Sequence, residues 1–176
     1  MKRRSLIAAL AALALLPACT SFSEITGTPE ETLEGRFSAA LSLNGARRVE
    51  TGGFALSSGP GGEQLDIRHP AAGVIARLSV TPVLSVLEAG GRRYEDASPE
   101  ALMLRELGFA IPVRGFPRWA AMRSPDEFVE DGWRITIAER DSAGLPKLIR
   151  ASRPETADAP AIRLTVFIEN RTRHAS

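Results

Sequence analysis

Few side chains in this chain of 176 residues could do covalent or metal chemistry. There is one cysteine, Cys19, and there are two histidines, His69 and His174. One cysteine excludes a disulfide framework and a multi-cysteine metal site, and two histidines leave little for a metal site or a proton relay. The sequence has no Gly-x-Ser-x-Gly elbow and no glycine-rich phosphate loop before a helix. We therefore expect a protein that is not an enzyme and binds no metal.

The cysteine ends a segment with the pattern of a secretory signal. Residues 1–18 begin with Lys2, Arg3 and Arg4, and an apolar run of 11 residues follows, from Leu6 to Leu16. A membrane-spanning helix needs about 20 apolar residues, so this run is too short for a stable span. Its length and its basic flank are typical of a signal peptide.

Leu16-Pro17-Ala18-Cys19 resembles the lipobox of bacterial lipoproteins. The resemblance implies that residues 1–18 are removed and that Cys19 carries an S-diacylglycerol and an N-acyl group such as palmitate. It also implies passage to the outer membrane, because Thr20 stands where Asp would retain the protein in the inner membrane. Residues 19–34 mix Thr, Ser, Gly, Pro and Glu, and we expect them to form a lipid-anchored tether. No further cofactor is expected.

The charge of the chain excludes another class of partner. The formal net charge is +1, but removal of residues 1–18 reduces 22 cations to 19 against 21 acids, a net charge of −2. Only Lys147 remains as a lysine. A nucleic-acid binder needs a strongly basic surface, so we expect no nucleic-acid partner.

Alternating apolar and polar residues predict strands along most of the body. Asn44-Gly45 predicts a hairpin turn, and Gly52-Gly53 a bulge or a bend. Asp66 is expected in solvent. The predicted strands cover residues 36–43, 49–57, 65–68, 74–80, 84–88, 92–95, 133–137, 145–148 and 162–168.

Two short helices interrupt the strands. Ser98-Pro99-Glu100 is a typical helix start, and Gly108 a typical stop. A second helix, from Gly115 to Met122, would present Phe116 and Trp119. We therefore predict one α+β domain over residues 35–170, a barrel or strongly curled antiparallel sheet with a helical excursion, and a tail over residues 171–176.

Several stretches, in order, resemble the LolB family of outer-membrane lipoprotein receptors. They are Gly35-Arg36-Phe37, Gly53-Phe54-Ala55, Pro70 to Gly73, Tyr94, Ser98 to Leu102, Leu107-Gly108, Ile111-Pro112-Val113, Arg118-Trp119-Ala120, Gly132 to Ile135, Leu145-Pro146 and Ile162-Arg163-Leu164.

This resemblance implies an open antiparallel β-barrel with a short helical lid around an apolar cavity. It also implies a lipid-anchored protein on the periplasmic face of the outer membrane, and we expect a monomer. Its partners would be a LolA-like periplasmic carrier, client lipoproteins and outer-membrane lipid. The protein would accept acylated lipoproteins into its cavity and insert them into the inner leaflet.

Candidate acyl-chain contacts follow from the apolar pattern and the resemblance. They are Leu102, Leu107, Phe116, Trp119, Trp133 and Ile135, any of which could equally belong to a solid core. The resemblance also places a membrane-facing loop at Pro70, Ala71, Ala72 and Gly73, where this chain lacks the family's large apolar tip. That difference keeps an alternative open, a lipid-anchored lipocalin-like binding or scaffold protein without transfer activity.

Overall fold

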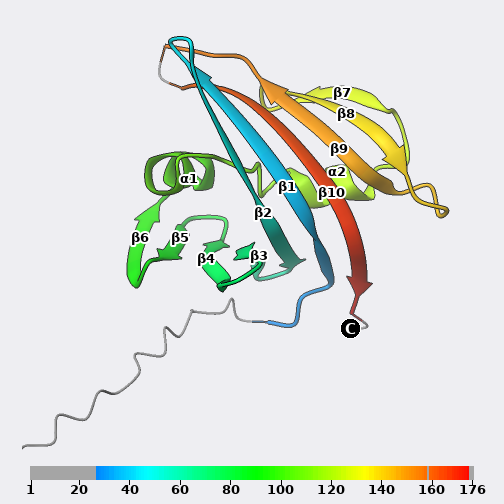
Figure 1. Cartoon of the computed structure of the whole chain (residues 1–176). Coiled ribbons are helices and arrows are strands. Elements are labelled where there is room, and N and C mark those ends of the chain that lie inside the picture. The colour runs from blue at the N-terminus through cyan, green and yellow to red at the C-terminus, as the bar shows by residue number, and fades with distance from the viewer. Residues whose placement is uncertain (1–26, 158, 175–176) are drawn as a thin grey trace, which may run out of the picture.

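The alternating segments of the sequence form one antiparallel sheet (Figure 1). The computed structural model describes residues 27–157 and 159–174. The strands in this part of the chain are β1 (Glu31–Leu43), β2 (Ala46–Gly59), β3 (Gly62–His69), β4 (Gly73–Val80), β5 (Ser85–Ala89), β6 (Arg92–Asp96), β7 (Glu127–Glu130), β8 (Trp133–Arg140), β9 (Pro146–Arg153) and β10 (Ala161–Arg173).

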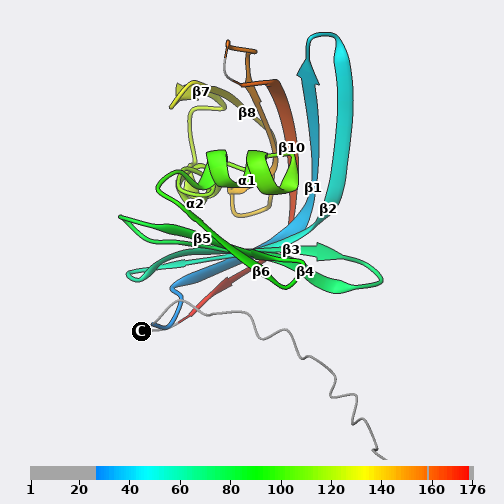
Figure 2. The same ribbon diagram turned by 90° about the vertical axis from the view of Figure 1, so that its left-hand side faces the viewer.

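The sheet is curled but does not close. Its strand order is β6-β5-β4-β3-β2-β1-β10-β9-β8-β7, so β6 and β7 form the two edges. Each pair of neighbouring strands in the sheet is consecutive in the chain, except β1 and β10. In Figure 2 the long strands β1, β2 and β10 stand upright while β3 to β6 lie across them, and both helices sit on the concave side. The predicted curled sheet with a helical excursion is confirmed.

Tight turns with positive φ values connect several hairpins. Asn44 and Gly45 have φ values of 50° and 80°, and Asp131 and Gly132 have values of 48° and 78°. Two successive residues with positive φ give the turn whose twist matches that of paired strands, and Asn-Gly and Asp-Gly favour it. The hairpin predicted at Asn44-Gly45 is confirmed.

Both predicted helices are present. The first, α1 (Pro99–Leu107), begins where the Ser98 hydroxyl accepts a hydrogen bond from the Ala101 N–H (3.2 Å), and it ends at Gly108 with φ of 79°. The second, α2 (Phe116–Ala121), is a short helix after the buried linker Phe109–Val113.

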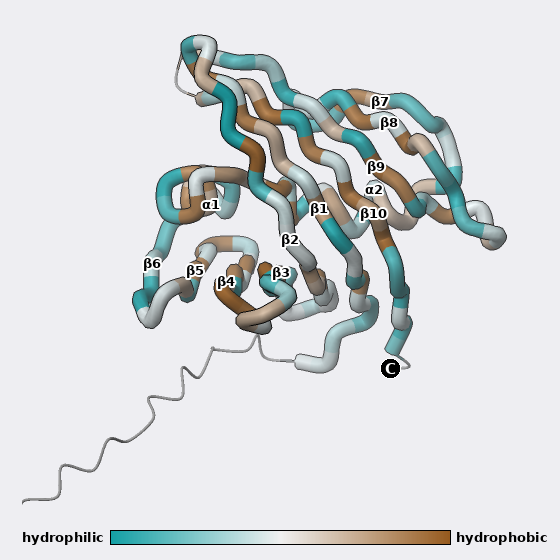
Figure 3. Tube along the Cα trace, in the orientation of Figure 1, coloured by the Kyte–Doolittle hydropathy of each residue, from teal (hydrophilic) through white to brown (hydrophobic). Residues whose placement is uncertain are grey.

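Burial follows the alternation of the sequence. Apolar and polar residues alternate along the long strands in Figure 3. The side chains of Leu33, Phe37, Ala39 and Leu41 in β1 are all buried and belong to one apolar core. The helices lie on the concave side in Figure 2 and contribute buried side chains to the same core, so the apolar core lies between the sheet and the two helices.

The structure differs from the sequence-based prediction at both ends of the domain. Strand β1 begins at Glu31 and buries Leu33, so the last residues of the predicted tether belong to the sheet. Strand β10 continues to Arg173, into the predicted tail.

The two glycines at Gly52-Gly53, where the sequence predicted a bulge or a bend, have a different role in the structure. The pairing of β1 with β2 runs through both glycines without a shift in register. A Cβ atom on Gly52 would lie 3.0 Å from the Phe37 ring, so this glycine makes room for a core aromatic side chain. The bulge lies instead in the pairing of β1 with β10, between Glu34 and Gly35.

The bulge at Gly35 leads to a first testable prediction. A Cβ atom there would lie 2.0 Å from the Phe167 carbonyl oxygen, so Gly35→Ala forces the two central strands apart. We expect it to lower the free energy of unfolding by about 1–3 kcal/mol, the usual cost of overpacking. At Gly53 the nearest atom to a new Cβ is 3.5 Å away, so Gly53→Ala is the matched control. Equal effects of the two variants in urea denaturation would contradict this account.

Candidate functional site

An aromatic cluster occupies the concave face where α2 meets the sheet. Trp119 of α2 is 1% exposed. Its ring centroid lies 6.5 Å from that of Phe116, 6.3 Å from that of Phe128 in β7 and 6.4 Å from that of Trp133 in β8, each in an edge-on arrangement. The Phe116 ring in turn meets Phe54 of β2 at 5.9 Å. The cluster therefore joins α2 to both halves of the curled sheet.

The first helix extends this apolar surface toward the other edge. Leu102 and Met103 of α1 are fully buried, and Leu107 is half-buried against the same core. Helix α1 contacts β5 and β6, and α2 contacts β9. Because the six candidate acyl-chain contacts all belong to this core or pack against it, the fold brings them together. They are Leu102, Leu107, Phe116, Trp119, Trp133 and Ile135.

The linker between the helices also belongs to the cluster. All of Phe109–Val113 is buried, and the Phe109 ring stacks on that of Phe37 with 5.2 Å between the centroids. The sequence indicated only a break in the chain here. A run of Phe, Ala, Ile and Val was the available signal, but burial of an irregular segment has no periodicity that could reveal it.

Strand β7 supplies two residues that the sequence analysis missed. Phe128 packs on Trp119, and the Glu130 carboxylate accepts a hydrogen bond from the Trp119 indole N–H at 2.9 Å. Glu130 also pairs with Arg118 of α2. The strand has four residues, too few for a clear alternation, and the Asp131-Gly132 pair after it is the one local signal that could have revealed it.

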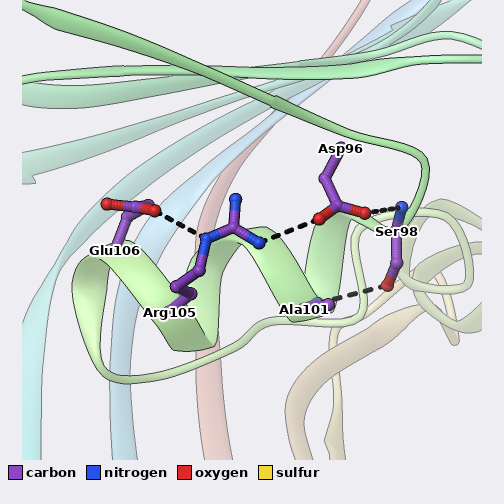
Figure 4. Close-up of polar contacts among 5 residues, drawn as sticks. All are labelled: Asp96, Ser98, Ala101, Arg105 and Glu106. Carbon is purple, nitrogen blue, oxygen red and sulfur yellow. Dashed lines mark hydrogen bonds and ion pairs between the residues drawn. The ribbon is translucent and has the colours of Figure 1, made fainter.

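Charged groups tie α1 to its entry turn (Figure 4). The Asp96 carboxylate accepts hydrogen bonds from the Ser98 N–H at 3.0 Å and from Arg105 at 2.9 Å, and Arg105 also donates to Glu106 at 2.7 Å. The Ser98 N–H, and then Arg105, lower the pKa of Asp96 below its usual range. The helix is therefore held in place from its exposed side as well as by its apolar face.

Glu100 in the first turn of α1 has the opposite shift. Burial raises the pKa of its carboxyl group above the usual range, although the Arg114 and Arg153 cations act against this effect. Glu100 is the acidic residue of the helix's first turn. Ionisation of this carboxyl group at neutral pH therefore lowers the stability of the folded protein.

The remaining predicted positions lie apart from this cluster. Pro70, Ala71 and Ala72 form the exposed turn between β3 and β4, and the exposed Gly73 begins β4. Cys19 lies outside the described residues.

The expectation of an exposed Asp66 is wrong. Its side chain is 9% exposed and pairs with Arg77 of the neighbouring strand through two hydrogen bonds of 2.6 and 2.7 Å. A bidentate pair satisfies both groups where they are partly buried. The alternation of β3 alone did not indicate that a neighbouring strand would supply this partner.

Within residues 27–157 and 159–174, no three His, Cys, Asp or Glu side chains gather in a way that could bind a metal ion. No helix in this part of the chain has the length and apolarity to cross a membrane.

Comparison with known proteins gives a consistent result. A model of the family "Outer membrane lipoprotein LolB" matches residues 32–170. Proteins named outer-membrane lipoprotein LolB are similar to this chain, including one from Bordetella pertussis, 29% identical over 88% of this chain and 87% of the relative. The protein of that name from Azoarcus sp. is 30% identical over 83% and 75% of the two chains. The one from Cupriavidus metallidurans is 25% identical over 96% and 98%.

The shifted pKa of Glu100 leads to a second prediction. A carboxyl group with a raised pKa in the folded state costs no stability below its unfolded pKa, and the cost appears as the pH rises through the folded value. Glu100→Gln should therefore gain stability relative to the unmodified protein between about pH 4 and about pH 7. Urea denaturation at both pH values measures this gain. Glu127→Gln, the same change of charge on β7, is the control, and a gain that does not depend on pH would refute the prediction.

Proposed function

The chain belongs to the outer membrane lipoprotein LolB family, and we propose that it receives acylated lipoproteins from a periplasmic carrier and inserts them into the outer membrane. The family match over residues 32–170 is the observation that carries this proposal. The step involves no covalent chemistry, in keeping with a family of lipoprotein localisation factors rather than enzymes.

The covered concave face supports the proposal physically. A lipoprotein cannot cross water with its acyl chains exposed, because each methylene group costs about 0.8 kcal/mol. The buried face of this protein consists of Leu, Ile, Phe and Trp side chains. Apolar contact is not directional, so such a surface accepts chains of different length and saturation.

In this proposal the helices act as the lid of an apolar cavity. Acyl chains enter between the sheet and the helices and replace contacts that the lid makes in the present structure. The side chains that would touch them are Leu102, Leu107, Phe116, Trp119, Trp133 and Ile135. The unpaired edges β6 and β7 allow the lid to move without breaking strand pairs.

We place the protein at the periplasmic face of the outer membrane, held by acyl chains on Cys19. Two or three chains give a lasting anchor, whereas one does not. The partners in this scheme are a LolA-like carrier, client lipoproteins and membrane lipid. The protein acts as a monomer.

Two observations favour a second candidate, a lipid-anchored binding or scaffold protein without transfer activity. The interior is closely filled, with Leu102, Trp119 and Ile135 all at most 1% exposed. The exposed loop at Ala71 and Ala72 also lacks a large apolar side chain. Mixing the protein with a carrier loaded with triacylated lipoprotein separates the two functions, because only the receptor takes up the lipoprotein.

Photo-crosslinking tests the proposed path of the acyl chains. A photoreactive residue at Leu107, which faces the core from α1, should form a crosslink to the lipoprotein after its transfer from the carrier. The same residue at Arg105, whose side chain is 50% exposed on the outer side of that helix, should not. Equal crosslinking from both positions, or crosslinking from Arg105 alone, would rule out entry beneath the lid.

Cys19→Ala tests the anchor. Because eleven residues lie between Cys19 and β1 in the sequence, we expect this variant to unfold at the same urea concentration as the acylated protein. It should still accept lipoprotein from the carrier but fail to deliver it to vesicles, because it no longer stays at their surface. Loss of folding would contradict the tether, and normal delivery would contradict the need for an anchor.

A further inference from the structure

The turn between β4 and β5 presents three consecutive apolar residues to solvent. Pro82, Val83 and Leu84 are exposed, and Val83 has 82% of its surface exposed. The Thr81 N–H donates to the Leu84 carbonyl oxygen at 2.9 Å, and the Thr81 hydroxyl accepts from the Leu84 N–H at 3.1 Å. These bonds fix the turn, so its apolar side chains are already in place for a partner and little conformational entropy would be lost on contact.

This turn lies near the place where the N-terminal segment joins the sheet. The Glu30 N–H donates to the Ser58 carbonyl oxygen at 2.8 Å. A Cβ atom on Gly59 would lie 3.3 Å from the Pro29 Cα atom. The turn between β2 and β3 lies next to the apolar turn at residues 81–84. A Cβ atom on Gly62 would lie 3.4 Å from the Thr81 Cα atom. Two strand spacings, about 10 Å, separate β2 from β4.

Chain length puts this end of the sheet near the anchor. Eight residues lie between Cys19 and Thr28, so nine Cα–Cα steps join them and the chain reaches at most about 30 Å. The turn at 70–73 lies at the opposite end of β4, which has eight residues and a length of about 26 Å. An anchor at Cys19 therefore brings the 81–84 end of the sheet to the bilayer more readily than the 70–73 end.

We propose that the Pro82-Val83-Leu84 turn docks on the lipid surface beside the Cys19 anchor and fixes which end of the open sheet faces the bilayer. This inference rests on the proposed function in one respect, the acylation of Cys19. Arg114 lies beside the turn, where its guanidinium donates to the Thr81 carbonyl oxygen at 3.1 Å. Its positive charge suits the phosphate groups of lipids.

The Pro82-Val83-Leu84 turn is better suited to contact with a bilayer than with a protein partner. A stable protein interface buries about 800 Å² on each partner, far more than three turn residues offer. A bilayer, by contrast, accepts single apolar side chains, and a second weak contact is enough to orient a protein that acyl chains already hold.

The test uses the mature acylated protein in vesicles of phosphatidylethanolamine and phosphatidylglycerol. Val83→Cys, Ala72→Cys and Val129→Cys each receive an environment-sensitive fluorophore on the new thiol, and a spin-labelled phospholipid serves as quencher. Val129 is 71% exposed on the edge strand β7 and is the matched control. We expect a blue-shifted emission and strong quenching for the label at residue 83, and neither effect for the labels at residues 72 and 129.

Each outcome decides the inference. Quenching at residue 72 rather than 83, or no quenching at 83, overturns it. Because Cys19 is the only native cysteine, an unmodified chain that takes up the fluorophore shows a free thiol, which overturns the anchor and the orientation that depends on it. Lipoprotein transfer is measured on the same vesicles. Quenching at 83 without transfer leaves the docking turn intact and overturns the receptor function alone.

Discussion

The concave face of the sheet is apolar and must be covered, and the rest of the structure follows from this constraint. An unclosed sheet cannot bury its inner face on itself alone. Two short helices and the buried linker between them fill the concave side, with Trp119 in contact with aromatic rings of α2, β7 and β8. Whatever removes the helices must supply an equal apolar surface, and this links the fold to the binding of acyl chains.

The two helices that cover the concave face are short and depend on their packing against the sheet. Helix α1 has nine residues and α2 has six, lengths at which a helix in water depends on its packing. Polar contacts at the rim add to that packing, through Asp96 with Arg105 and through Glu130 with Trp119 and Arg118. The half-buried Glu100 acts in the other direction, because desolvation penalises its ionised form. In the proposed function, these helices leave the sheet while the central pairing of β1 with β2 and β10 stays intact.

The elements of the fold could be predicted where the local signal was complete. The alternation of β1 and β8, the turn at Asn44-Gly45 and the cap at Ser98 each depend on a few neighbouring residues, and all are present. The pairing of Asp66 with Arg77 and of Trp119 with Glu130 joins residues eleven positions apart on different elements, which no periodicity reveals. Periodicity also could not show whether the apolar stripe of α1 faces a solid core or a space for a ligand.

The filled interior bears on the direction of lipoprotein transfer in the proposed function. If acyl chains bind only when the lid has moved, the apparent affinity equals the intrinsic affinity multiplied by the fraction of open molecules. Side chains that fill the concave face, such as Trp119 and Phe116, lower this fraction and therefore the affinity. A receptor that binds acyl chains weakly gives them up to a bilayer, where burial of each methylene carries no such cost. The packing that closes the protein in the absence of a client thus favours release of the client to the membrane.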